Sequence, residues 1–424
     1  MKTFKLGAHF ATCLTSPLLA AALLLTTLSA AKANDADVSI FKISGYGTLG
    51  ILHSSESQAD YTNSPSVKPN GAGYSHNWSA DVDTRLGLQI SADISPKLSA
   101  VLQVITQQRY DNSYSPTVEW ANINYALTPE FNIRLGRIAM PTFLVGAYRN
   151  VGYAVPWARP PIQLYGQMLP VTQSDGIDAS YRHSFGDISN VVQVSYGESN
   201  INTPGQLMPS RARNIMGIFN TIESGPATFR ASYQQAELTI PIVNSLFDNF
   251  KYFGPAGSAI ADQYSFEHRR ISMLAFGVNY DPGDWFLVAE WGHGKFSSFL
   301  GAQTAWYVSG GYRLGTLTPY LTYSQSKKQG DTAAAGLDLT TLPPAIVANA
   351  AQLNGILNSL LKPNTGSTFS IGSRWDFRKD AALKLQFDLV KLDGNSAGAL
   401  LNIQPAYRPG GSFQVISATV DFVF

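Results

Sequence analysis

The sequence ends in SATVDFVF, residues 417–424, where polar and apolar side chains alternate up to the last residue. The two parities are an apolar set, Ile416, Ala418, Val420 and Phe422, and a polar set, Ser417, Thr419 and Asp421. Successive side chains of a β-strand point to opposite faces. The segment therefore predicts a strand with one apolar and one polar face, followed by Phe424.

The same alternation recurs along the chain in stretches of about ten residues, beginning with FKISGYGTLGI at residues 41–51. We count sixteen such stretches, joined by seven short turns that alternate with mostly long segments rich in Gly, Pro, Asn and Ser. The regular alternation of short and long connections predicts an all-β, antiparallel up-and-down transmembrane barrel, with the short turns at one end and the long segments at the other. Eighteen strands are the alternative, because the long segments 239–268 and 328–366 could each hide one.

The lipid phase explains why such a sheet has to close. In hydrocarbon every backbone N–H and C=O group needs a protein partner, so strands can span the membrane only as a barrel without edges. The last strand should therefore pair with the first. Sixteen strands leave a water-filled interior, which predicts a pore with polar inward faces. Aromatic residues near strand ends predict girdles at the lipid interfaces: Tyr125, Phe131, Tyr280, Trp285, Trp291, Trp306, Tyr312, Trp375 and Phe424.

The first 33 residues have the pattern of a signal peptide. Lys2 and Lys5 precede an apolar run, and Ala31-Lys32-Ala33 has the form of a cleavage site. We expect export, cleavage after Ala33 and one barrel domain over residues 34–424. The single cysteine, Cys13, leaves with the signal. The mature chain then has 27 basic and 29 acidic residues, a formal charge of −2, which gives no support for a nucleic-acid partner.

The opening FKISGYGTLG, the LGR at residues 135–137 before a long connection and the terminal aromatic residue resemble the Gram-negative general (diffusion) porin family. The resemblance implies a homotrimer in the lipid of the cell outer membrane that passes small hydrophilic solutes and ions passively. It also implies that Phe424 is recognised by the machinery that inserts barrels.

In such porins the third long connection, here residues 138–174, folds back into the lumen and narrows it. This segment contains Arg149, Arg159 and several aromatic residues but no carboxylate. The resemblance places a basic wall opposite it, formed by Arg85, Arg109 and Arg134, with Asp81 and Asp83 near Arg85 on the lumen face. Further charges on inward parities include Asp178, Arg230, Glu290, Arg374 and Asp388.

Asp81 and Asp83 could neutralise part of the positive charge at the constriction by pairing. We expect the arginines to outnumber these carboxylates and to leave a positive potential with a mild anion preference. The alternative is that Arg149 and Arg159 bond neighbouring carbonyl groups and only fix the loop. Two other functions stay open. One is a substrate-selective channel in which Tyr153, Trp157 and Tyr165 form a stacking track for sugars or for aromatic or carboxylic acids.

The more distant alternative is a barrel enzyme such as an outer-membrane phospholipase, for which His183 beside Ser184 is the nearest pair to a catalytic one. We predict no catalytic, cofactor or metal site. One segment, Pro344–Leu361, breaks the β pattern. Its apolar residues share one helical stripe, which predicts a helix at the extracellular mouth: Ile346, Ala350, Leu353, Leu357 and Leu360.

Overall fold

The computed structural model describes residues 40–424 other than 169–170, 206–207, 297 and 331–332. The predicted signal peptide, residues 1–33, lies outside the described residues. Residues 41–424 form one compact unit. Among the described residues, no helix combines the length and the apolar character needed to cross a membrane.

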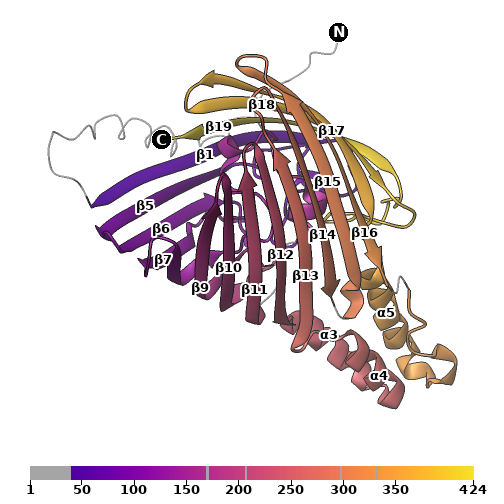
Figure 1. Cartoon of the computed structure of the whole chain (residues 1–424). Coiled ribbons are helices and arrows are strands. Elements are labelled where there is room, and N and C mark those ends of the chain that lie inside the picture. The colour runs from indigo at the N-terminus through magenta and orange to yellow at the C-terminus, as the bar shows by residue number, and fades with distance from the viewer. Residues whose placement is uncertain (1–39, 169–170, 206–207, 297, 331–332) are drawn as a thin grey trace, which may run out of the picture. The chain divides into compact units, whose positions relative to one another are not determined.

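Sixteen long strands form one closed antiparallel sheet, as predicted (Figure 1). They are β1 (Phe41–Ser54), β5 (Arg85–Ser95), β6 (Leu98–Gln107), β7 (Thr117–Ala126), β8 (Phe131–Ala139), β9 (Gln173–Phe185), β10 (Ile188–Ile201), β11 (Ser210–Ser224), β12 (Ala227–Thr239), β13 (Arg269–Tyr280), β14 (Trp285–Phe296), β15 (Ala302–Tyr312), β16 (Leu317–Gln329), β17 (Gly366–Arg378), β18 (Ala381–Leu392) and β19 (Ser412–Val423). A short extra strand, β4 (Trp78–Ser79), pairs with β1. The alternative count of eighteen spanning strands is wrong.

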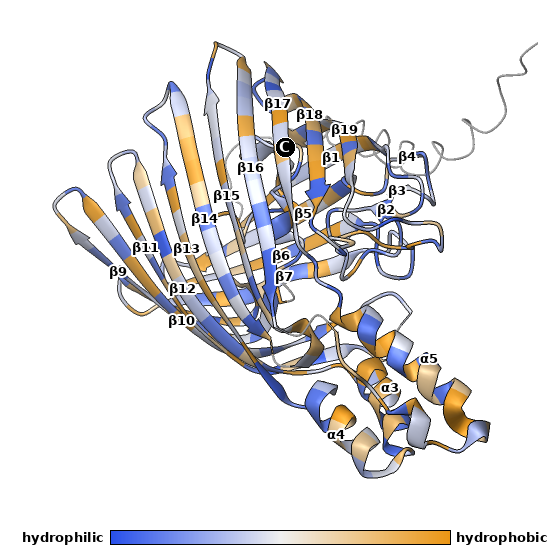
Figure 2. Ribbon diagram, turned by 90° about the vertical axis from the view of Figure 1, so that its right-hand side faces the viewer, coloured by the Kyte–Doolittle hydropathy of each residue, from blue (hydrophilic) through white to orange (hydrophobic). Residues whose placement is uncertain are grey.

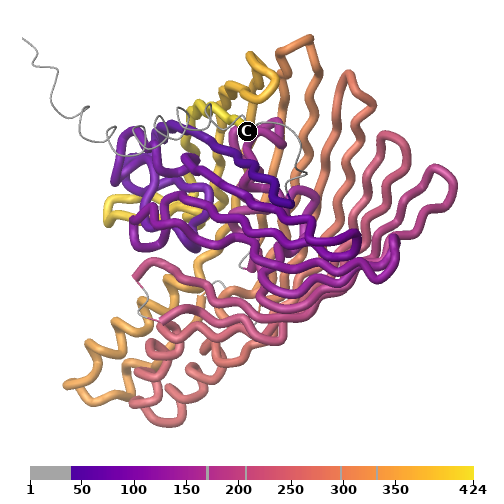
Figure 3. Tube along the Cα trace, turned by 90° about the vertical axis from the view of Figure 1, so that its left-hand side faces the viewer, coloured from indigo at the N-terminus to yellow at the C-terminus, as the bar shows by residue number. Residues whose placement is uncertain are grey.

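The barrel closes where β19 pairs with β1, from Tyr46 opposite Val423 to Ser54 opposite Val415. Figure 3 shows the indigo start of the sheet beside its yellow end. The alternation that opened the sequence analysis is confirmed, because Ser417, Thr419 and Asp421 are buried inside while Ile416 is exposed on the outer face.

Two glycines of β1 leave room for the aromatic rings at the end of β19 to pack against the β1 backbone. A Cβ atom on Gly45 would come within 2.2 Å of the Phe424 ring, and one on Gly47 within 2.3 Å of the Phe422 ring. Phe424 also exchanges both backbone hydrogen bonds with Gly45. The SGYG stretch of the first strand therefore fits the aromatic end of the last one.

One girdle of aromatic side chains surrounds the end of the barrel that carries the short turns. Its exposed members are Tyr125, Tyr280, Trp285, Tyr312, Trp375 and Phe424. Trp291 and Trp306 lie opposite each other within β14 and β15, away from the turns. Hydrophobic and hydrophilic residues alternate along the strands in Figure 2, which is the pattern of a barrel with lipid outside and water inside.

The long connections lie at the other end and carry the helices. Those suspected of hiding strands instead contain α3 (Pro241–Lys251), α4 (Gly254–Tyr264) and α5 (Pro344–Leu361), which project beyond the barrel (Figures 1 and 2). The predicted helix is confirmed with the same bounds, and its residues Ala350 and Leu357 are buried. The remaining short elements are β2 (Asp60–Tyr61), β3 (Ala72–Gly73), η1 (Gly152–Ala154), α2 (Ile162–Tyr165), η2 (Ser298–Leu300) and η3 (Leu339–Thr341).

Candidate functional site: the constriction loop and the lumen

The described part of the segment between β8 and β9, residues 140–168 and 171–172, folds into the barrel as predicted, and we call it the constriction loop. Its contacts are with inward-facing side chains of strands from both halves of the sheet. The charges of that wall decide how the loop is held.

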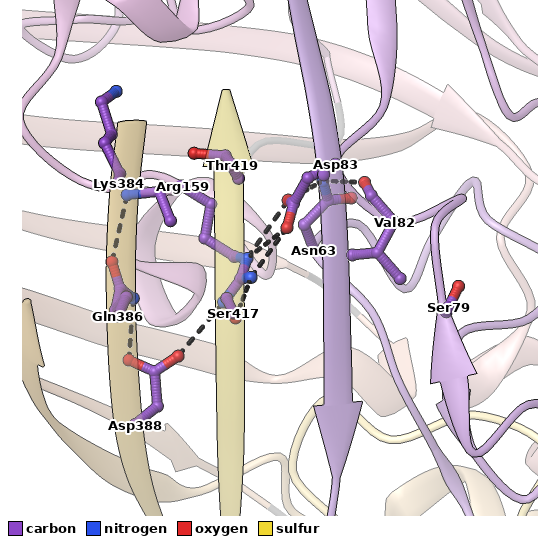
Figure 4. Close-up of polar contacts among 12 residues, drawn as sticks. Asn63, Ser79, Val82, Asp83, Arg159, Lys384, Gln386, Asp388, Ser417 and Thr419 are labelled. Atoms are coloured by element: carbon purple, nitrogen blue, oxygen red, sulfur yellow. Dashed lines mark hydrogen bonds and ion pairs between the residues drawn. The ribbon is translucent and has the colours of Figure 1, made fainter. Parts of the chain in front are cut away.

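Arg159 is the most deeply buried cation of the loop, with a 2 % exposed side chain. Its guanidinium group donates to the Asp83 carboxylate at 2.7 and 3.2 Å, to Asp388 at 3.1 Å and to the Ser417 hydroxyl at 2.6 Å (Figure 4). It also lies 5.7 Å from the centre of the Tyr61 ring. Burial opposes the charge, but the carboxylates outweigh it and raise the pKa of Arg159 above its ordinary value.

Lys384 of β18 holds the loop by its backbone. Its fully buried ammonium group donates to the carbonyl oxygens of Gly152 at 2.6 Å and Trp157 at 3.0 Å, and it pairs with Asp421 at 2.9 Å. Asp421 in turn accepts a hydrogen bond of 2.5 Å from Thr48 of β1. The polar face of the last strand therefore serves to anchor the loop.

We expect Gly152→Ala to loosen this anchor. A Cβ atom at position 152 would lie 2.0 Å from Oδ1 of Asp421 and 2.6 Å from Oγ1 of Thr48, so the backbone has to move away from Lys384. Overpacking of this kind costs about 1–3 kcal/mol. The urea midpoint of the detergent-solubilised protein should fall. Gly411→Ala is a control for glycine replacement as such, because a Cβ atom at position 411 would meet only the Arg408 carbonyl oxygen at 4.0 Å. Equal midpoints for the two variants would contradict the packing argument.

Glu290 of β14 anchors the start of the loop. Its buried carboxylate accepts hydrogen bonds from the Leu144 amide at 2.6 Å, the Tyr165 hydroxyl at 2.5 Å and the Tyr307 hydroxyl at 2.6 Å. Arg230 of β12 donates to the Phe143 carbonyl oxygen at 2.9 Å. Burial, together with the Glu290 carboxylate, raises the pKa of the Tyr165 phenol above its ordinary value, so the phenol stays a neutral donor.

The aromatic residues of the loop do not form a track open to solutes. Trp157 is 2 % exposed and donates its indole N–H to the Ser309 hydroxyl at 2.7 Å, and Tyr165 is also buried. Tyr153 lies at the turn end, where its hydroxyl donates to the Lys379 carbonyl oxygen at 2.7 Å and its ring stacks on Arg374 at 4.6 Å. Trp157 and Tyr165 pack on the wall because an apolar loop inside a polar barrel needs apolar contacts.

Arg149 at the tip of the loop is also paired. Its Nη2 donates to Glu119 of β7 at 3.0 Å and its Nη1 to the Gly146 carbonyl oxygen at 3.0 Å. Glu119 is the extra residue of a β-bulge, because Gln103 pairs with Trp120 and the next residue, Val104, pairs with Val118. A bulge re-aims a side chain, and here the carboxylate meets the loop.

Both loop arginines are therefore paired with carboxylates, and for Arg159 the neutralising effect expected of Asp83 is the one that prevails. The alternative in which Arg149 and Arg159 brace the loop agrees with their contacts. Their partners, however, are mostly carboxylates and not the carbonyl groups that were predicted. Glu290 and Asp388 were predicted to face inward, but the loop residues that contact them were not predicted. Glu119 and Lys384 were missed altogether.

The five predicted wall residues are not all on the wall. Arg85 begins β5, whereas Asp81 and Asp83 lie in the turn before it and Arg109 in the connection after β6. Asp81 accepts a hydrogen bond of 2.6 Å from the Tyr114 hydroxyl. Arg134 of β8 forms a bidentate ion pair with Asp178 of β9, donating hydrogen bonds from Nε, at 2.9 Å, and from Nη2. Of the predicted basic wall, Arg85 and Arg109 thus remain without an ion pair among the described residues.

Two polar cavities lie on the two sides of the constriction loop. The cavity on the side of the long connections has a volume of about 290 Å³, and its lining includes Lys68, Arg85, Arg109, Glu119 and Arg149. The cavity on the side of the short turns has a volume of about 530 Å³, and its lining includes Tyr148, Arg230, Asp281, Arg313 and Arg374. The loop tip borders both, with Tyr148 in the lining of the larger cavity and Arg149 in the lining of the smaller one.

Comparison with known proteins assigns the sequence to a family. The sequence matches the model of the Gram-negative porin family over residues 19–335. The chain belongs to this family, a class of outer-membrane channels. No curated protein matches the sequence closely enough to count as a relative.

Solved structures agree on the fold. The Salmonella typhi OmpF complex with daunomycin is 14 % identical, with a TM-score of 0.51 over 91 % of this chain and 97 % of that chain. An anion-selective porin from Comamonas acidovorans is 13 % identical, with a TM-score of 0.51 over 91 % of this chain and 99 % of that chain. At these identities the likeness concerns the barrel alone.

Proposed function

We propose that this protein is a diffusion porin that passes small hydrophilic solutes and ions through a fixed constriction, with a mild anion preference. The observation that carries the proposal is the position of the constriction loop, anchored inside a closed barrel with a polar cavity on either side. Buried ion pairs at Arg159 and Lys384 argue for a fixed loop and against a moving gate. The preference follows from the cavity facing the long connections, whose unpaired side chains are cations.

The proposal includes export and assembly. The signal peptide is removed after Ala33, Phe424 is read by the barrel-insertion machinery, and three copies assemble in the outer membrane. Conductance in a planar bilayer tests the channel, and the reversal potential in a potassium chloride gradient tests the preference. Cross-linking in mild detergent tests the trimer. A planar bilayer that shows no conductance after the protein is added would contradict the channel function. A protein that stays monomeric on cross-linking would contradict the trimer.

A barrel hydrolase is the competing function, and the placement of its residues disfavours it. His183 and Ser184 are neighbours in β9 and therefore point to opposite faces of the sheet. The His183 ring stacks on Tyr181, with ring centres 6.4 Å apart. We propose that the protein is not an enzyme, and phospholipid hydrolysis by the detergent-purified protein would refute this.

Selectivity should depend on the pair between Arg149 and Glu119. Glu119→Gln leaves Arg149 charged without its partner and should move the reversal potential towards anion preference, whereas Arg149→Gln should move it towards cation preference. Two unit charges ~4 Å apart interact by about 1 kcal/mol in bulk water, which corresponds to a change of about fivefold. Both shifts should shrink at higher ionic strength because salt screens the charges.

Lys97→Gln is the matched control for this pair of variants, because Lys97 is exposed in the turn between β5 and β6 and lies outside the lining of both cavities. It should leave the reversal potential close to that of the natural sequence. Shifts of the same sign in both the Glu119 and the Arg149 variants would show that this pair does not set the selectivity.

A further inference from the structure

We propose that Arg85 and Lys68 form a binding site for the carboxylate group of a small organic anion, in the cavity between the constriction loop and the long connections. This inference rests on the proposed channel function and adds a preferred class of solute to it. It starts from the charges in the lining of that cavity.

Five cationic side chains border the cavity, together with the carboxylate of Glu119. Two of the five are neutralised, since Arg149 pairs with Glu119 and Arg159 with Asp83 and Asp388. Within the part of the chain that the structure describes, the other three have no ion-pair partner: Lys68, Arg85 and Arg109. The lining of the cavity therefore holds more cations than carboxylates, and Asp83, which lies behind the lining and attracts both Lys68 and Arg85, offsets only part of this excess.

Arg85 is the member of this set that the fold leaves most clearly unsatisfied. Its side chain is 7 % exposed, and neither Nε nor Nη2 has a hydrogen-bond partner. Buried donors almost always have partners, and a guanidinium group without one is costly. Both atoms are covered by protein, so binding of a carboxylate requires the Arg85 side chain to turn its Nε and Nη2 edge towards the cavity that the residue lines.

The unsatisfied edge of Arg85 is one that this protein uses elsewhere for carboxylates. Arg137 holds Asp175 through Nε at 2.6 Å and Nη2 at 2.7 Å, and Arg134 holds Asp178 through the same two nitrogens. Two parallel N–H groups match the two oxygens of a carboxylate in spacing and direction. This match favours a carboxylate over a spherical anion such as chloride.

Lys68 adds a second positive charge to the lining of the same cavity. It is 4 % exposed, and its ammonium group donates to the carbonyl oxygens of Asp81 at 3.1 Å and Val82 at 3.3 Å. An ammonium group has three donors, so one more remains. Burial lowers the pKa of Lys68 to about 8, and most copies therefore carry the charge at pH 7.

The test is block of potassium chloride conductance in a planar bilayer by succinate, with phosphate compared at the same ionic strength and pH 7. We expect succinate to reduce the conductance saturably and phosphate to do so more weakly. Arg85→Lys keeps the charge but removes the paired N–H groups. It should raise the half-blocking succinate concentration about tenfold.

Lys68→Gln gives a second variant, which should also weaken the succinate block, and Lys97→Gln should not. A channel that conducts but is not saturably blocked by succinate would overturn the site and leave the channel function intact. Equal block by phosphate and succinate, or an unchanged half-blocking concentration in both Arg85→Lys and Lys68→Gln, would overturn the carboxylate assignment. A protein that conducts no ions would instead contradict the proposed function itself.

Discussion

Arg159→Ala is expected to destabilise the protein by about 3–5 kcal/mol, because removing one partner of a buried ion pair leaves the other charges uncompensated. The charges left behind are Asp83 and Asp388, whose side chains are only 1 % and 2 % exposed. The Ser417 hydroxyl also loses the guanidinium donor. We expect a lower urea midpoint, together with a larger and noisier single-channel conductance as the constriction loop leaves the wall.

The matched control is Arg378→Ala, which removes an arginine from an exposed pair with Asp380, with side-chain exposures of 69 % and 48 %. Exposed pairs contribute about 0–1 kcal/mol, so this variant should unfold close to the natural sequence. Adding Asp83→Asn and Asp388→Asn to Arg159→Ala should recover part of the loss. Equal urea midpoints for Arg159→Ala and Arg378→Ala would show that the buried cluster does not hold the loop.

The pH dependence of this loss has a definite sign. Burial raises the pKa of Asp83, whereas Arg159 and the neighbouring cations lower it. The cations have the larger combined effect, so the pKa of Asp83 lies below its ordinary value of 3.8. A group with a lowered pKa adds stability above its unfolded pKa, and this stability disappears as the pH falls through the folded pKa. The difference between Arg159→Ala and the natural sequence should therefore be present at pH 5–8 and shrink below about pH 4.

The sequence predicts features that depend on neighbouring residues, but it does not predict contacts between residues that lie far apart in the chain. Alternation along the strand decides faces, so the inward position of Ser417 and Asp421 follows from residues 417–424 alone. The partners of Arg159 cannot be found in this way, because Asp83 and Asp388 lie 76 and 229 residues away and meet only when the barrel closes.

Glu119 shows a second limit, since one extra residue in β7 reverses the face that simple alternation assigns. The charge of the constriction loop could be read from its composition, but its compensation could not. Lys384 was overlooked because a lysine on a strand of a water-filled barrel is expected to face water. In the folded protein it is fully buried beneath the loop.

Lys384→Met should be as damaging as Arg159→Ala, for a different combination of reasons. Asp421, also fully buried, keeps its hydrogen bond from Thr48 but loses its cation, and the carbonyl oxygens of Gly152 and Trp157 lose their donor. Loss of one partner from a buried pair costs about 3–5 kcal/mol, and each unsatisfied carbonyl group adds about 1–3 kcal/mol where water cannot reach it.

The double variant Lys384→Met with Asp421→Asn separates these two contributions. It removes the unpaired charge but restores no donor to the two loop carbonyl groups, so it should recover only part of the urea midpoint. Full recovery would show that the ion pair alone matters and that the bonds to the loop backbone add nothing. No recovery would mean that the ammonium group acts through those backbone bonds. The single-channel conductance of the double variant should stay above the natural value even where the urea midpoint is partly recovered, because the variant still lacks the ammonium group that binds the Gly152 and Trp157 carbonyl oxygens of the constriction loop.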